Sequence, residues 1–188
     1  MGTSKSVGSP KTLSWQTVAS AYLSENQSPD RIAQLIWRAS SGDASTDIAQ
    51  FLGHPAPIAC LKAALEYSNP AAASAAAAQI IAQQRLAGIS ADLSRRALVQ
   101  AFASSDRIKG FVTSLFAEAT NYLVARDISP LLGHSPRLAY LSHTRTLKEK
   151  IVESVRACVA SQRLPETIPN HASWRRLVDG ITRRLRNA

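Results

Sequence analysis

Apolar residues recur every three or four positions along most of the chain, which is the spacing of one face of an α-helix. The pattern is clearest over residues 106–126 and 143–164 and again from residue 171 to the end. In the last of these segments the apolar positions are Trp174, Leu177, Val178, Ile181 and Leu185. The alternation typical of a β-strand is never sustained, so the sequence predicts an all-α protein.

Two prolines indicate where helices begin. Pro29 follows Ser28 and Pro70 follows Asn69, and both pairs place a capping side chain directly before a residue that suits the first helical position. Gly88 follows the alanine-rich stretch after Pro70, and we expect it to end that helix.

One block of sequence occurs twice. DIAQFLGHPAPIACL (47–61) and DISPLLGHSPRLAYL (127–141) agree at seven of fifteen positions. Three further pairs of segments follow the same order along the chain at offsets of 76, 78 and 79 residues: SPDRI and SSDRI, AQQRL and ASQRL, SRRALV and SWRRLV. This order predicts an internally duplicated helical protein.

The repeat divides the chain into four parts. We expect a flexible N-terminal tail over residues 1–11, a first helical unit over 12–91, a second over 92–170 and a closing basic amphipathic helix over 171–188. Each unit has room for about five helices. Three similar segments support the division: Leu13–Tyr22, Leu93–Phe102 and Ala172–Ile181.

Each copy of the repeated block contains Leu-Gly-His with a proline close behind. This pattern is typical of a helix end, where Gly53 and Gly133 take the left-handed conformation and His54 and His134 bond exposed carbonyls. A second interpretation makes the two histidines a symmetric site, which would give a metal-dependent or hydrolytic enzyme.

The excess of positive charge lies wholly in the second half of the chain. The whole sequence has 22 Lys and Arg against 13 Asp and Glu, for a net charge of +9. Residues 1–94 carry six of each sign and are neutral, so residues 95–188 hold the entire excess. This uneven charge predicts a partner with negative charge.

Arginine dominates that excess, and its planar guanidinium suits carboxylates and phosphates. We expect the binding residues to be Arg95, Arg96, Arg107, Arg175, Arg176, Arg183, Arg184 and Arg186. An acidic protein partner is the first interpretation. Sequence-independent binding of nucleic-acid backbone is the alternative, and no helix-turn-helix or zinc-finger pattern indicates base reading.

Familiar catalytic signatures are absent from the sequence. It has no glycine-rich phosphate loop, no G-x-S-x-G, no H-E-x-x-H and no C-x-x-C, so we expect no catalytic residue, metal or cofactor. The two cysteines cannot form a disulfide framework. No apolar run reaches about 18 residues and the first residues lack the apolar core of a secretory signal, so we expect a cytoplasmic protein without a membrane span.

The first ten residues, MGTSKSVGSP, carry a family resemblance. They resemble the start of the small component of bacterial Qat anti-phage operons, which often open Met-Gly-Thr-Ser with Ser, Gly and Pro following. The resemblance implies an accessory protein that depends on a partner and has no catalytic residues to transfer. Together with the charge, it predicts a non-catalytic adaptor that binds an acidic protein through its basic half.

Overall fold

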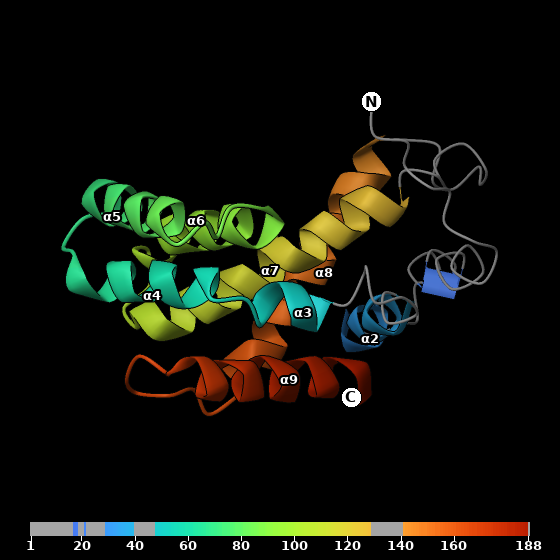
Figure 1. Ribbon diagram of the computed structural model, residues 1–188. Coiled ribbons are helices and arrows are strands. Elements are labelled where there is room, and N and C mark those ends of the chain that lie inside the picture. Colours follow the sequence, from blue (N-terminus) through green and yellow to red (C-terminus); the bar gives the residue numbers. More distant parts are fainter. Residues whose placement is uncertain (1–16, 19–20, 22–28, 40–47, 129–140, 188) are drawn as a thin grey trace.

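The computed structural model describes residues 17, 18, 21, 29–39, 48–128 and 141–187 (Figure 1). Every regular element in this part of the chain is an α-helix, which confirms the all-α prediction for it. The helices are α2 (Pro29–Ala39), α3 (Ile48–Leu52), α4 (Ala56–Glu66), α5 (Pro70–Gln83), α6 (Ile89–Ala101), α7 (Arg107–Ile128), α8 (Leu141–Ala160) and α9 (His171–Asn187).

Helix α7 is the centre of the arrangement. It packs along α6 on one side and along α8 on the other, and it also touches α3 and α4. Helices α5 and α6 lie at one edge of the molecule, whereas α9 lies at the opposite edge in Figure 1. Helix α9 packs on α2, α3 and α8. The two edges therefore present separate surfaces.

Large apolar side chains on α2 and α9 pack against α7. The ring of Trp37 on α2 lies 6.1 Å from the ring of Phe116, and the ring of Trp174 on α9 lies 6.4 Å from that of Phe111. All four side chains are fully buried. Because aromatic side chains bury the largest areas, these two tilted pairs are major contributors to the attachment of α2 and α9.

Helices α4 and α5 pack through small side chains. Ala63 and Ala64 on α4 and Ala73 and Ala77 on α5 are fully buried. A methyl side chain lets two helix backbones approach closely but buries little area per residue. The alanine-rich composition is therefore used at a helix–helix contact.

The expected helix boundaries agree with the structure at most positions. The helices predicted over 106–126 and 143–164 are α7 and α8, the second ending four residues earlier than predicted. Pro70 begins α5 as expected, and the side chain of Asn69 accepts a hydrogen bond of 2.8 Å from the backbone N–H of Ala72. The reading of Asn69 as a cap is confirmed.

The prediction that Gly88 ends α5 is wrong. Helix α5 ends at Gln83, and Arg85 takes the left-handed position that glycine usually fills, with φ of 52°. The N–H of Leu86 then reaches back to the carbonyl of Ile81 at 2.9 Å, as in a Schellman turn. Gly88, with φ of 136°, instead precedes the first residue of α6.

None of the described helices combines the length and the apolar composition needed to cross a membrane.

Candidate functional site

Helix α9 is held against the body by its apolar stripe. Trp174, Val178, Ile181 and Leu185 are buried, as the spacing in the sequence predicted. At its start, the side chain of Asn170 accepts a hydrogen bond of 2.9 Å from the N–H of Ser173 and so caps the helix. The polar side of α9 is therefore left facing outward.

The end of the short helix α3 lies against the first turn of α9 and the first turn of α6. A helix leaves its last carbonyls without partners inside the helix, and three side chains from other helices contact those of α3. Ser90 on α6 donates to the carbonyl of Phe51 at 2.6 Å, and the indole N–H of Trp174 donates to that of Leu52 at 2.6 Å. Nε2 of His171 lies 3.0 Å from the carbonyl oxygen of Gly53.

Gly53 ends α3 as predicted, but the conformation expected for it is wrong. Among the described residues, Gly88 is the one glycine with positive φ, so Gly53 is not left-handed. Glycine is needed at position 53 because there is no room for a Cβ. A Cβ at position 53 would lie 2.8 Å from the carbonyl oxygen of Ala49 and 3.6 Å from Cγ of Arg175. The close approach of the Ala49 carbonyl, four residues earlier in the chain, therefore requires glycine, whereas 3.6 Å from Arg175 on α9 is an ordinary van der Waals contact.

His54 differs from its expected role. Its Nδ1 accepts a hydrogen bond of 3.3 Å from the backbone N–H of Ala56, so it serves the start of α4. The histidine beside the carbonyl at the end of α3 is His171 instead. Gly133 and His134 lie outside the described residues, so the proposed symmetric pair of histidines has no described geometry.

The polar side of α9 is rich in arginine. The helix carries Arg175, Arg176, Arg183, Arg184 and Arg186 against a single acidic residue, Asp179. The first four are exposed and Arg186 is half-buried. Among the described residues, none of those four exposed arginines forms a salt bridge with a carboxylate. We call these five arginines the α9 basic face.

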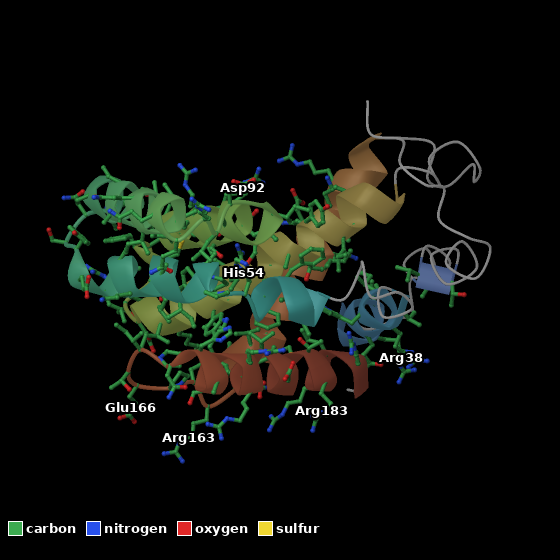
Figure 2. The ribbon with its side chains drawn as sticks, in the orientation of Figure 1. Arg38, His54, Asp92, Arg163, Glu166 and Arg183 are labelled. Atoms are coloured by element: carbon green, nitrogen blue, oxygen red, sulfur yellow. The ribbon has the colours of Figure 1, made fainter. Side chains whose placement is uncertain are left out.

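Two arginines outside the predicted set extend this face. Nε of Arg38, at the end of α2, donates to the backbone carbonyl of Arg186 at 2.9 Å. Figure 2 shows Arg163, from the segment that precedes α9, projecting on the same side of the molecule as Arg183. Arg38 lies in the electrically neutral half of the sequence, so charge distribution along the chain gave no signal for it.

The arginines of α6 lie elsewhere. Arg95 and Arg96 are exposed on α6, at the edge of the molecule opposite α9 (Figure 1). Arg96 also lies 3.6 Å from Glu118 on α7, which offsets its charge. The structure therefore does not bring these two arginines together with the α9 basic face.

The side chain of Arg107 makes contacts within the protein. Its guanidinium donates to the carbonyls of Ala64 at 2.9 Å and Tyr67 at 2.7 Å, at the end of α4. The same group lies 4.6 Å from the centroid of the Phe102 ring, a favourable cation–π distance. Because these contacts occupy the guanidinium, we leave Arg107 out of the candidate surface.

A groove of about 700 Å³ separates the first turn of α7 from the segment that follows α8. Its lining includes Asp106, Lys109 and Glu166, so both signs of charge meet there. Asp106 is already used, because its carboxylate accepts a hydrogen bond of 2.9 Å from the N–H of Lys109. The groove therefore does not continue the positive charge of the α9 basic face.

Nucleophilic and metal-binding groups are sparse in the part of the chain that the structure describes. Burial raises the pKa of the Cys60 thiol to about 12, against the opposing effect of the nearby Arg95 charge, so this thiol stays protonated at neutral pH. No three His, Cys, Asp or Glu side chains among the described residues come together in a group that could hold a metal ion.

Comparison with protein families, with curated proteins and with solved structures yields no match to this chain.

Proposed function

We propose that this protein is a non-catalytic adaptor that binds an acidic protein partner through the α9 basic face. The observation that carries this proposal is the absence of carboxylate partners for the exposed arginines of α9 within the described residues, although Arg96 and Arg145 elsewhere pair with Glu118 and Glu149. Arginines without a carboxylate partner on a rigid helix can bind external carboxylates with little further ordering.

The helix dipole accounts for only part of this arginine content. Cations near the end of a helix are stabilised by its negative pole, which suits Arg184 and Arg186 in the last turn. Arg175 and Arg176 lie near the beginning of α9, where the dipole offers no such stabilisation. Their presence is therefore better explained by an external partner.

An internal duplication remains our proposal for the architecture. In its favour, α2 begins inside SPDRI and α7 begins at the corresponding SSDRI. The two units differ at one clear point. Asn69-Pro70 separates α4 from α5, whereas Glu149-Lys150, eighty residues later, lies inside the single helix α8. Loss or gain of one proline explains why two helices correspond to one.

The resemblance of the first ten residues supports an accessory role in a bacterial anti-phage operon, with the cytoplasm as the expected location.

The alternative function, nucleic-acid binding, uses the same arginines, because guanidinium groups also suit phosphates. Among the described residues, the large apolar side chains that are exposed are Tyr67, Ile89, Val99 and Ile168. None of them lies on α9, so that helix has no exposed aromatic ring placed for base stacking. This observation favours the protein partner.

The test compares two variants with the same loss of charge. Arg176→Gln with Arg183→Gln removes two charges from the α9 basic face, and Arg85→Gln with Arg95→Gln removes two exposed charges elsewhere. We expect the first to weaken binding of poly-L-glutamate about tenfold at low salt and the second to change it little, with affinity measured by fluorescence anisotropy. Equal losses, or tighter binding of a DNA duplex than of polyglutamate, would contradict the proposal.

A further inference from the structure

Gly180 lies in the middle of the polar side of α9. It is exposed, its φ is not positive, and apart from its chain neighbours and the nearby backbone of α9 itself no atom lies within 4 Å of where a Cβ would be. Glycine inside a helix is destabilising relative to alanine because the unfolded chain has more conformations to lose. Neither the backbone nor the packing of this chain requires glycine here, in contrast to Gly53.

Arginines lie on both sides of this open position. Residues three, four and seven apart share one side of a helix, so Arg176 and Arg184 each lie one turn from Gly180. Arg176 and Arg183 are seven residues apart, which places them about 10 Å apart along the axis. An acidic helix with carboxylates at every seventh residue has the same spacing.

Two more residues border this position, and we call them together with Gly180 the seam. Ser173 lies seven residues before Gly180 and Leu177 lies three residues before it, and both are half-buried. Nη2 of Arg176 donates to the hydroxyl of Ser173 at 3.2 Å, so Gly180 is the position that leaves room for the backbone of another helix, and Leu177 offers it an apolar contact. Helices normally pack 8–10 Å apart, and small residues at the contact permit the lower end of that range.

We propose that the occupant of this seam is an α-helix with acidic residues at seven-residue spacing, whose backbone crosses α9 at Gly180. This inference rests on the proposed function, since it specifies the form of the acidic partner. A second copy of α9 is disfavoured because five arginines would face five arginines. Nucleic-acid backbone contacts the tips of long side chains, so it does not require glycine at position 180.

The test uses two synthetic acidic peptides of identical composition. Both carry glutamate at every seventh position on an alanine-rich background. One is built from L-residues and is helical, whereas the other alternates D- and L-residues and cannot form an α-helix. We expect the helical peptide to bind at least tenfold more tightly, measured by fluorescence anisotropy at low salt.

Substitutions at position 180 then locate the contact. Gly180→Leu should weaken binding of the helical peptide at least tenfold and leave the D/L peptide unchanged, with Gly180→Ala intermediate. All these chains should stay folded, because the site is open, and melting temperatures check this. Ala75→Leu, on the exposed side of α5, is the matched control and should not alter either affinity.

The outcomes separate this inference from the proposed function. Equal affinity for the two peptides, or a Gly180→Leu variant with unchanged affinity for the helical peptide, overturns the inference while leaving an acidic partner in place. If neither peptide nor polyglutamate binds the unsubstituted protein at low salt, the proposed function fails and this inference fails with it.

Discussion

Helices α5 and α9 lie at opposite edges of the molecule (Figure 1). They differ in their charge and in the size of the side chains that they bury. Helix α5 has no charged residue among its 14 positions, whereas α9 has five arginines and one aspartate among 17. Helix α5 buries small side chains such as Ala73 and Ala77, whereas α9 buries Trp174. The contrast supports our proposal that α9 makes an external contact.

The two helices are also held in place differently. Helix α5 supplies its own ends, through the Asn69 cap and the Schellman turn at Arg85. Helix α9 has a local cap at Asn170, but it also has distant partners, because His171 and Trp174 contact the carbonyls that end α3. Local hydrogen bonds therefore hold both ends of α5, whereas the beginning of α9 is held by tertiary hydrogen bonds as well. Three substitutions test that difference.

Trp174→Ala should have the largest effect. It removes a fully buried indole, its contact with Phe111 and the hydrogen bond to the carbonyl of Leu52. We expect the free energy of unfolding to fall by about 3–5 kcal/mol, measured by urea denaturation. Trp174→Phe keeps most of the ring and should lose only about 1–2 kcal/mol, mainly from the missing hydrogen bond. Equal losses for the two variants would contradict this division.

Asn69→Ala should have an intermediate effect, confined to α5. It removes the side chain that accepts from the N–H of Ala72, and we expect a loss of about 1 kcal/mol in the free energy of unfolding. Asn69→Asp keeps the acceptor and should lose little. The Ala variant should also leave the affinity of α9 for polyglutamate unchanged. An unchanged free energy of unfolding would mean that this cap does not stabilise α5.

Arg85→Gly should have the smallest effect, with the opposite sign. It relieves a non-glycine residue with φ of 52°, so we expect the free energy of unfolding to rise by about 0.5–1 kcal/mol. Arg85→Ala removes the same charge but keeps the left-handed strain, and it should not stabilise. A thermal melt of both variants distinguishes relief of strain from loss of charge, and a gain for the Ala variant would support the latter.

The sequence predicted the features that depend on neighbouring residues. The apolar spacing of α7 and α9 identified both helices and their buried faces, because that spacing recurs over several turns. Asn69-Pro70 identified the start of α5, because a cap needs only its own first turn. The outward position of the arginines on α9 follows from the same spacing.

Features that depend on which helices meet could not be predicted. Arg107 looks like a binding residue until its contacts with the end of α4 are known. The separation of Arg95 from the α9 basic face requires the spatial order of α6 and α9.

The hydrogen bonds between α9 and α3 join residues that are 118 and 122 positions apart. During biosynthesis the ribosome must therefore add more than a hundred residues after α3 before its carbonyls can meet α9. At about 5–20 residues per second this takes about 6–24 s. From the synthesis of Phe111 until that of Trp174 the ring of Phe111 lacks the indole that packs against it, so a nascent chain that stalls before Trp174 would be a natural target for chaperones and proteases.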